Sequence, residues 1–516
     1  MRSADLILEN ANVVDVEAGT SAVASIAVSG ERLLAVGRPD EIASLRRPGS
    51  RAIDLTGKTV IPGLIDAHAH VEWTGLMAFA VDLRPAKSVR AVQELVAARA
   101  REQPEGTLLT GWGLQDNPLG EARLPTKEEL DAVAPRHYVR LQRDDGHACV
   151  VNTLTLERLG YTAETPGMEM VSGRSTGVLR AQANQDAESR LQDSVTPEMS
   201  ERGLHAAASD ALKVGLTTVH ALEGADATSL EQMARLRGAL EALPIRTVLW
   251  YQTSHVDRAK ALGLRRIGGC LLLDGAPGSY TGALFEPYSD RPQTSGILYF
   301  SDQAIREFVL EAHKEGLQIA VHATCQRSVE QAISAYENAL KAHPRADHRH
   351  RIEHCSVCPP PLLERLREVG AIVVTQPAFI YYSGERYLKD VPDTQRPWLY
   401  RTRSFLESGL HPAGSSDCPV SPCSPLAGVY AAVTRKAESG QVLSPEEAVS
   451  ARDALKLYTL GGAYASFEEQ RKGSIEVGKL ADLVVLSADP TAVEPQEICG
   501  IRVEKTIVGG EIVWER

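Results

Sequence analysis

Two histidines, His68 and His70, are the residues whose types and spacing first suggest chemistry in this sequence. They follow an apolar run, Val60 to Ile65, that is broken by Pro62-Gly63. Residues i and i+2 of an extended strand point to the same face, so the two imidazoles would lie side by side. Neutral imidazoles donate lone pairs to metal ions, and the pair therefore predicts a shared metal. A histidine pair on a solvated turn is the alternative interpretation.

Three further potential metal ligands occur in the same context, at or just past the end of an apolar β run. They are His322 in Ile-Ala-Val-His-Ala-Thr, His354 in His-Arg-Ile-Glu-His-Cys and Asp417 in Pro-Ala-Gly-Ser-Ser-Asp. The strands of a parallel barrel all end on one face, where active sites lie. Side chains spread from position 68 to position 417 would therefore converge. One histidine at a strand end is usually a satisfied polar residue, but four such places in order make that interpretation weak.

An α/β pattern between about residues 59 and 465 must position these side chains. Short apolar β runs alternate there with helical patterns, which predicts a (β/α)8 barrel of the TIM type. Such a barrel needs about 250 residues, so we assign the excess to an insertion at about residues 71–200. Helices are expected over residues 89–103 (with Ser88 as N-cap), 199–214, 302–315, 361–369 and 445–458.

Both ends of the chain are patterned differently from its middle. Residues 1–58 and 466–516 carry short apolar or alternating runs between glycines, which is typical of β-strands. Strands from both ends, with little between them, predict one small β-sandwich built from the two termini around the inserted barrel.

The composition, 43% hydrophobic and 24% charged, is that of an ordinary globular protein. A formal net charge of −12 argues against nucleic acid or an anionic membrane as partner. We find neither a signal peptide nor an uncharged apolar window long enough for a membrane span. The eight cysteines are scattered without the regular spacing of a disulfide framework, which favours a reduced, cytoplasmic setting. Cys355 and Cys358 are interpreted as ordinary buried thiols.

Several motifs together resemble the amidohydrolase superfamily, and within it the N-substituted formamide deformylase-like branch (amidohydrolase 3). The order His-x-His, His, His, Asp inside a barrel flanked by a two-ended sandwich carries the resemblance to the superfamily. The resemblance to the branch spans nearly the whole chain. Its motifs are Pro62-Gly-Leu-Ile-Asp-Ala-His-Ala-His70, Asp145-Gly-His147, Gly296-Ile-Leu, His350-Arg-Ile-Glu-His354, Gly414-Ser-Ser-Asp-Cys-Pro-Val-Ser421 and Gly473-Ser-Ile-Glu-Val-Gly-Lys-Leu-Ala-Asp-Leu-Val-Val-Leu486.

Carried over to the matching positions, the resemblance implies that His68, His70, His322 and His354 bind one or two divalent metal ions, with zinc favoured. Asp417 would contact a metal and act as general base toward the hydrolytic water. Such a metal lowers the pKa of its water from 15.7 to about 7 and polarises a carbonyl, so these ligands suit hydrolysis near neutral pH.

Cys270 is a departure from the family pattern. Relatives with two metals usually carry a bridging carboxylated lysine in a Val-Lys-x-x-x-Asp-Gly context, and the matching segment here is Gly269-Cys-Leu-Leu-Leu-Asp-Gly275. Some amidohydrolases use a cysteine thiolate in place of that lysine, and a soft anionic thiolate suits zinc. Cys270 is thus a metal ligand on one interpretation and an apolar filler on the other.

The insertion contributes two pocket candidates through motifs shared with the resembling branch. Trp112 would pack against an apolar substituent, and His147 would donate a hydrogen bond to the carbonyl or oxyanion. A buried structural tryptophan and a turn-capping histidine are the alternatives. Arg327, Gln376 and Tyr382, which lie near strand ends, are further candidates for substrate binding.

The favoured function is hydrolysis of a carbon–nitrogen bond other than a peptide bond, in an amide such as an N-acyl or N-formyl amine. One alternative is a mononuclear deaminase that acts on a heterocycle, because the same ligands support that reaction. A metal-free binding protein is the other, and the complete ligand set argues against it. A small-molecule substrate is expected, and a homodimer fits an exposed sandwich and a large barrel.

Overall fold

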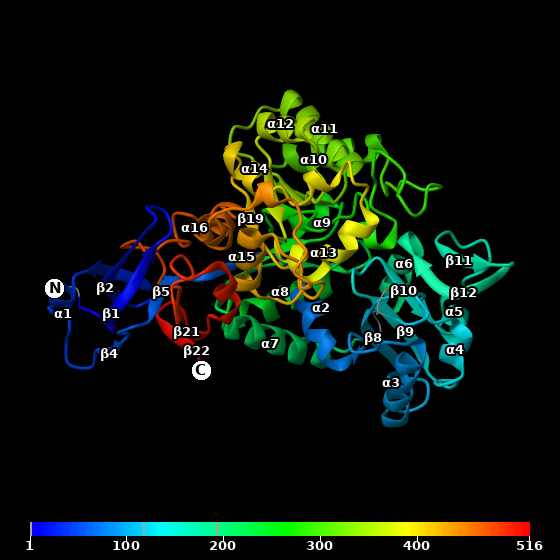
Figure 1. Cartoon of the computed structure of the whole chain (residues 1–516), viewed down its shortest axis with the longest axis horizontal. Helices are drawn as coiled ribbons and strands as arrows, with labels where there is room; N and C mark the ends of the chain where they lie inside the picture. The colour runs from blue at the N-terminus through cyan, green and yellow to red at the C-terminus, as the bar shows by residue number, and fades with distance from the viewer. Residues whose placement is uncertain (1–2, 117–118, 192–194) are drawn as a thin grey trace.

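This computed structural model describes residues 3–116, 119–191 and 195–516, which form three parts. A sheet built from both termini lies at one end of the molecule, a barrel at its centre and the insertion at the other end (Figure 1). The N- and C-termini lie close to the terminal sheet. The predicted fold class, a TIM-like (β/α)8 barrel with a large insertion and a small β-sandwich formed from both termini, is confirmed.

The terminal unit is an eight-stranded sheet to which both ends of the chain contribute. Its order is β22-β21-β20-β5-β1-β2-β3, and β4 pairs with β1 beside this path. Apolar side chains from both ends, including Leu8, Ile26 and Leu483, form one core. The strands are β1 (Leu6–Asp15), β2 (Thr20–Ser29), β3 (Arg32–Gly37), β4 (Arg51–Asp54), β5 (Thr59–Pro62), β20 (Leu483–Leu486), β21 (Val503–Val508) and β22 (Glu511–Glu515).

The stretch from Thr59 to His70, which carries the His68 and His70 pair, is divided between two sheets. β5 pairs with β20 and β1 in the terminal sheet, whereas β6 (Leu64–Ala69) pairs with β13 of the barrel. Gly63 is the joint, and its N–H donates to the Asp482 carbonyl at 2.8 Å. A Cβ at Gly63 would lie 2.2 Å from Thr217 Oγ1, so only glycine allows this close approach.

The barrel is an eight-stranded parallel sheet in the order β19-β18-β17-β16-β15-β14-β13-β6. It closes just beyond β19, where Asp417 N–H donates to the His68 carbonyl and His70 N–H to the Cys418 carbonyl, both at 2.9 Å. The functional loops are therefore part of the closing seam. The remaining strands are β13 (Leu216–Glu223), β14 (Arg246–Tyr251), β15 (Arg266–Ile267), β16 (Gln318–Ala323), β17 (Arg351–His354), β18 (Ile372–Thr375) and β19 (Ala413–Gly414).

Helices cover the barrel in the expected alternation (Figure 1). Three expected helices appear within two residues of their predicted ends, as α7 (Pro197–Lys213), α10 (Asp302–Lys314) and α12 (Pro360–Val369). The helix expected over 445–458 is wrong in its first half, because α16 begins only at Ala451, where the Ser450 side chain accepts from Asp453 N–H. The other helices here are α2 (Val71–Leu76), α8 (Leu230–Glu241), α9 (Val256–Ala261), α11 (Gln326–Ala342), α13 (Ala378–Asp390), α14 (Thr402–Glu407), α15 (Pro425–Thr434) and α16 (Ala451–Lys456).

The insertion folds around its own six-stranded sheet, in the order β11-β12-β10-β9-β8-β7. Its helix α3 (Val89–Glu102) begins as predicted, because the Ser88 side chain accepts from Ala91 N–H at 3.1 Å. The turn between β9 and β10 reaches the barrel. The strands are β7 (Val81–Asp82), β8 (Leu108–Leu114), β9 (Tyr138–Arg143), β10 (Ala148–Val151), β11 (Met168–Val171) and β12 (Arg174–Arg180), with helices α4 (Lys127–Asp131), α5 (Thr153–Leu159) and α6 (Ala181–Leu191).

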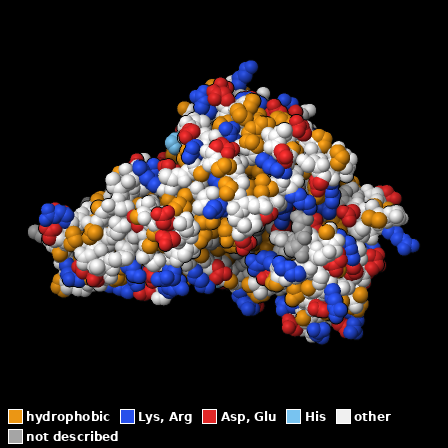
Figure 2. All heavy atoms as spheres, in the orientation of Figure 1, with side chains coloured by type: hydrophobic (Ala, Val, Ile, Leu, Met, Phe, Trp, Pro, Cys, Tyr) orange, Lys and Arg blue, Asp and Glu red, His pale blue; other side chains and the backbone are white. Residues whose placement is uncertain are grey.

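The face of the molecule seen in Figure 2 carries interspersed basic and acidic side chains rather than one large patch of either sign. All eight cysteines are free thiols. Within residues 3–116, 119–191 and 195–516, no helix combines the length and the apolar character that crossing a membrane requires.

A chain of three buried histidines lies at the N-terminal end of the barrel strands, away from the strand ends that carry the predicted ligands. Ile319 N–H donates to His350 Nδ1 at 3.1 Å, and His350 Nε2 then donates to His313 Nδ1 at 2.8 Å. His348 Nδ1 accepts from the N–H of His350 at 3.0 Å. Nδ1 of both His348 and His350 thus accepts from a backbone N–H, which favours the neutral ring, and burial lowers the pKa of both.

His348 and His350 should make the protein less stable in mild acid. Their folded pKa values lie below the unfolded value of about 6.5, so their contribution is complete above that pH and decreases as the pH falls. The free energy of unfolding should fall by up to about 1.4 kcal/mol per pH unit for each ring. Urea unfolding between pH 7.5 and 5 measures this slope. A shallower slope is expected for His348→Asn, whose amide does not titrate, and equal slopes would contradict the assignment.

Candidate active site

The six predicted metal ligands come from the C-terminal ends of five barrel strands. His68 lies in β6 and His70 follows it, His322 lies in β16, and His354 ends β17. Cys270 follows β15, and Asp417 follows β19, each by three residues. All except His70 and Cys270 are almost completely buried. The convergence expected from the sequence is thus what the barrel produces.

His68, His70 and Asp417 form the first group of potential ligands. Asp417 Oδ1 lies 3.2 Å from Nε2 of His68 and 3.2 Å from Nε2 of His70. Yet His68 Nε2 and Asp417 Oδ1 are buried atoms that make no hydrogen bond within the described chain. Buried polar atoms without a partner are costly, so this convergence of unpartnered atoms fits the binding of a cation.

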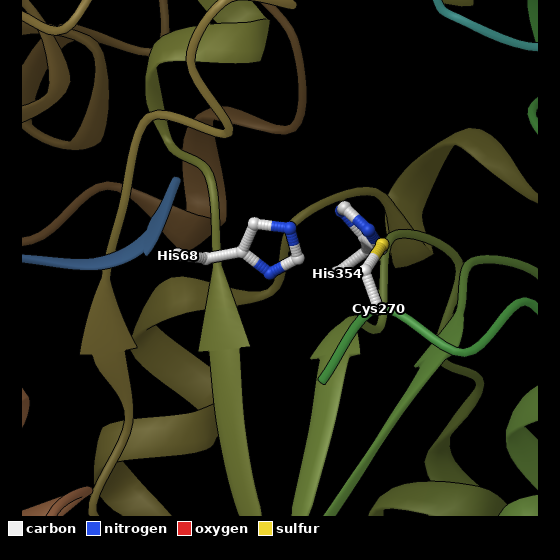
Figure 3. A group of neighbouring side chains, drawn as sticks. All are labelled: His68, Cys270 and His354. Carbon is white, nitrogen blue, oxygen red and sulfur yellow. The ribbon is translucent and has the colours of Figure 1, made fainter. Parts of the chain in front are cut away.

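His68, Cys270 and His354 form a second group, whose potential ligand atoms lie within 4.8 Å of one another. Figure 3 shows these side chains reaching into a common space from separate segments of the barrel. His354 Nε2 is buried without a hydrogen-bond partner in the described residues. His322 adjoins this group, with its Nδ1 3.6 Å from Cys270 Sγ. The two groups share His68 and His322 adjoins the second, so the six candidate residues could hold one ion or two.

Two of the ligands have strained backbones. His354 has φ 71° and Asp417 has φ 55°, values in the left-handed region that side chains with a Cβ rarely adopt. Each such residue costs of order 1–3 kcal/mol, and such strain accumulates where a function requires it.

A layer of hydrogen bonds behind the ligands fixes which ring nitrogen faces the site. Glu353 Oε2 lies 2.7 Å from His68 Nδ1, and the Leu222 carbonyl lies 2.9 Å from His70 Nδ1. Gln376 Oε1 lies 2.9 Å from His354 Nδ1. Because each contact engages Nδ1, the lone pair of Nε2 is left free to face the other candidate metal ligands. Glu353 thus supports His68, and Gln376, predicted to bind substrate, places its Oε1 against the ring of His354.

Electrostatics couples the ligands to one another. Burial by itself raises the pKa of Asp417, but His68, His70 and His354 outweigh it and hold that pKa well below the usual range. Burial lowers the pKa of His70, but Asp417 and Cys270 raise it to about 10. The anionic forms of Asp417 and Cys270 therefore attract positive charge to this point, which either protons or a metal ion can supply.

The residues present fit a first-row divalent metal. They offer imidazole nitrogen, carboxylate oxygen and thiolate sulfur, the ligands that zinc accepts. In a tetrahedral zinc site with bonds of about 2.0–2.1 Å, neighbouring ligand atoms lie about 3.3 Å apart. The observed 3.2 Å between Asp417 Oδ1 and each histidine Nε2 matches that spacing.

Comparison with known proteins decides the family. The model described as "Amidohydrolase family" matches residues 51–514. The chain belongs to the amidohydrolase family. This confirms the resemblance noted in the sequence and makes the protein a hydrolase acting on carbon–nitrogen bonds other than peptide bonds.

Individual relatives cover nearly all of this amidohydrolase. N-substituted formamide deformylase of Arthrobacter pascens is 30% identical over 543 aligned residues, which cover 99% of this chain and 98% of that protein. The structure of an uncharacterized metal-dependent hydrolase from Pyrococcus furiosus is 28% identical with a TM-score of 0.73, covering 94% of this chain and 99% of that one. Atrazine chlorohydrolase TrzN from Arthrobacter aurescens TC1, complexed with zinc, shares the fold at 17% identity and a TM-score of 0.53, covering 99% and 95%.

A pocket opens directly onto the ligands of this amidohydrolase. It contains about 540 Å³ of empty space, including space open to solvent, and His322, His354 and Asp417 lie in its wall. The predicted residue His147 also lines it, with its ring 5.3 Å from the ring of His322. Burial lowers the pKa of His147 to about 4, with His322 adding to the shift, so its ring is neutral at pH 7.

The predicted substrate contacts Trp112, Arg327 and Tyr382 do not line this pocket. The Trp112 ring is buried against Trp73, with centroids 4.6 Å apart. Arg327 lies on α11 and donates to Ser295 at 3.4 Å, and the Tyr382 ring packs on Tyr381. Proximity to a strand end in the sequence does not determine which face of the following helix a side chain occupies.

Sequence reasoning missed part of the pocket wall. Helix α13 contributes Phe379, Ser383, Arg386 and Tyr387, which recur on one helical face. Their spacing in the sequence was a usable signal for one shared face. Nothing in the sequence showed that Arg386 faces Asp144 of the insertion, 242 positions earlier.

Proposed function

We propose that this amidohydrolase cleaves the amide bond of a small N-acyl or N-formyl amine, with Asp417 as the general base. The observation that carries the proposal is the Asp417 carboxylate. It lies in the pocket wall, its Oδ1 is 3.2 Å from Nε2 of both His68 and His70, and that oxygen has no hydrogen bond within the described chain. The name of the Arthrobacter pascens relative, which aligns over almost its full length, supports an N-substituted formamide as one substrate type.

The proposed cofactor is a divalent metal, with zinc preferred because the ligand set contains histidine and a thiol. The zinc in the TrzN structure, a protein of the same fold, is in keeping with this choice. When bound, the metal would supply a hydroxide equivalent near neutral pH and polarise the substrate carbonyl. His68, His70, Asp417, Cys270, His322 and His354 would hold one ion or two.

The chain's own residues account for proton transfer and orientation in this scheme. The Asp417 carboxylate would take the proton from the attacking water and pass it to the amide nitrogen as the carbon–nitrogen bond breaks, releasing a carboxylate and an amine. His147, neutral and lining the pocket, would donate a hydrogen bond to the carbonyl oxygen as negative charge develops there. Glu353 and Gln376 would fix the orientation of the His68 and His354 rings through their contacts with Nδ1.

Metal analysis followed by a substrate screen tests this function. The purified protein would be reconstituted with Zn, Co or Mn and assayed with N-butylformamide, N-cyclohexylformamide and the matching acetamides. Carboxylate plus amine as products supports the proposal, whereas ammonia released from a heterocycle would favour the deaminase. Protein that takes up no metal, with His68→Asn behaving as the wild type, would favour a binding protein despite the family.

Cys270→Ser tests the number of metal ions. If the thiolate is a ligand, the variant should bind less metal than the wild type, and activity should fall by about 10-fold or more, because serine is a poor zinc ligand. Metal content after dialysis and the rate of amide hydrolysis measure both effects. Cys149→Ser, a buried thiol of the insertion, is the matched control. Unchanged stoichiometry and activity in Cys270→Ser would leave Cys270 as an apolar filler.

We further propose that the protein's partner is a small-molecule substrate rather than nucleic acid or a membrane. We also propose that it forms a homodimer, which light scattering would test. A cytoplasmic setting is retained because all eight cysteines are free thiols.

A further inference from the structure

The insertion reaches the pocket through one turn, residues 144–147 between β9 and β10. Asp144, Asp145 and His147 line the pocket, and Arg386 of helix α13 lines it from the barrel side. A contact between insertion and barrel therefore forms part of the active-site wall. The mechanism proposed above uses His147 and leaves the three charged residues unexplained.

Arg386 joins this turn to the barrel. Its Nη2 donates to Asp144 Oδ2 at 2.5 Å, and its Nη1 lies 3.3 Å from Asp144 Oδ1 and 4.0 Å from Asp145 Oδ2. The Arg386 and Asp144 side chains are each only 14% exposed, so water screens the pair weakly. A Cβ on Gly278 would lie 2.8 Å from Arg386 Cδ, so glycine at that position leaves room for the arginine side chain.

Asp145 transmits the position of the turn to His147. Its Oδ1 accepts from the backbone N–H of His147 at 3.0 Å, and its Oδ2 accepts from Ser279 Oγ at 2.6 Å. Arg143 lies 3.5 Å from the same Oδ2 and donates to the Gly278 carbonyl at 2.7 Å. The His147 ring makes no side-chain hydrogen bond within the described chain, so the turn itself decides where that ring lies.

We propose that Arg386 is a positioning residue that acts through His147. By pairing with Asp144 and Asp145 it docks the turn on the barrel and sets the His147 ring against His322. Without Arg386, the adjacent carboxylates of Asp144 and Asp145 would keep the neutral donor Gln115 and the arginine Arg143 as neighbours in a poorly solvated pocket, and their repulsion would shift the turn. The inference rests on the role of His147 in the proposed function.

A double-mutant cycle between Arg386→Ala and His147→Ala tests the coupling. With the best amide of the screen, His147→Ala should lower kcat about 10²-fold, as loss of an oxyanion donor does. Arg386→Ala should lower kcat about tenfold with KM changed less than about threefold, because a misplaced donor weakens mainly the transition state. The double variant should behave as His147→Ala alone, and metal content should stay that of the wild type in every variant.

Three further variants or conditions separate positioning from loss of folding. Guanidinium added below denaturing concentration should restore activity to Arg386→Ala but not to the double variant. Gly278→Ala, which displaces the arginine without removing it, should share the loss in kcat. Arg365→Ala removes an arginine that pairs with Glu337 and Glu330 on the outer helices, and should leave kcat unchanged.

A crystal structure of Arg386→Ala provides a readout that needs no substrate. The distance between the His147 and His322 ring centroids, 5.3 Å in the wild type, should increase or the turn should become disordered. An unmoved turn, a wild-type kcat in Arg386→Ala, or a tenfold loss that persists on the His147→Ala background would each overturn the proposal. If no amide is hydrolysed by the wild type, the proposed function fails while the crystal structure still decides the positioning.

Discussion

Asp417→Asn should lower kcat by about 10³-fold at saturating metal, within the 10²–10⁴ that general acid–base catalysis contributes. The amide keeps the shape of the carboxylate but cannot accept the proton of the attacking water. Asp417 lies in the pocket wall, and its Oδ1 faces the Nε2 atoms of His68 and His70 without a hydrogen bond of its own. Amide hydrolysis measured with the metal content of the same sample checks the effect, because it separates lost catalysis from lost metal.

Asp489→Asn is the matched control for this change. Asp489 also accepts hydrogen bonds from side chains, those of Asn12 and Ser21, but it lies on the terminal unit far from the pocket in sequence and structure. The same chemical change there should leave kcat as in the wild type. A metal-loaded Asp417→Asn enzyme with kcat within about threefold of the wild type would exclude Asp417 as the general base.

Arg351→Met should destabilise the protein by about 3–5 kcal/mol, the range observed when one partner of a buried ion pair is removed. Arg351 and Glu353 are both completely buried and joined by two contacts of 2.7 Å. Arg351 also donates to the Ala67 carbonyl at 2.7 Å, next to His68. Its loss removes the cation that pairs with the Glu353 carboxylate in the barrel interior and leaves that carboxylate its contact with His68 Nδ1. Because Glu353 supports His68, metal affinity should also fall about 10–100-fold.

Chemical unfolding of the apoprotein and metal competition with a chelator measure these two losses. Arg351→Met/Glu353→Leu should recover much of the stability, because it removes both charges, but not the metal affinity. Arg365→Met, which breaks a partly exposed pair on the outer helices, should cost less than about 1 kcal/mol. A loss in Arg351→Met no larger than in this control would show that the buried pair contributes little.

The residues around His68 could be predicted from local features of the sequence. A strand followed by His-x-His, and histidines or an aspartate at later strand ends, are local features, and parallel strands must bring their ends together. The ligand set could therefore be predicted from sequence. The direction of the Gln376 side chain could not be predicted in this way, because its amide lies behind His354 rather than in the pocket. Whether a polar residue faces substrate or supports a ligand depends on side-chain direction, which spacing alone does not determine.

Pro62-Gly63 shows the same limit at the level of the fold. Pro62-Gly63 is the one interruption in the apolar run from Val60 to Ile65, yet the two sides of it, β5 and β6, pair in different sheets. Strand propensity is the same on both sides of the joint, and only the partners differ. Those partners, β20 of the C-terminal region and β13 of the barrel, are far away in the sequence.

The sequence by itself determined the barrel, the β-sandwich of the two termini and five potential ligands at strand ends, because periodicity and residue type along one chain encode them, whereas Cys270 was added by the resemblance to the family. The tertiary structure decided what depends on distant contacts. In the tertiary structure Glu353 and Gln376 lie behind the candidate ligands. Trp112, Arg327 and Tyr382 lie outside the pocket wall. Arg386 of the barrel pairs with Asp144 of the insertion. The physical reason is that hydrogen bonds and ion pairs act over a few ångströms in space, and residues hundreds of positions apart become neighbours only when the barrel closes.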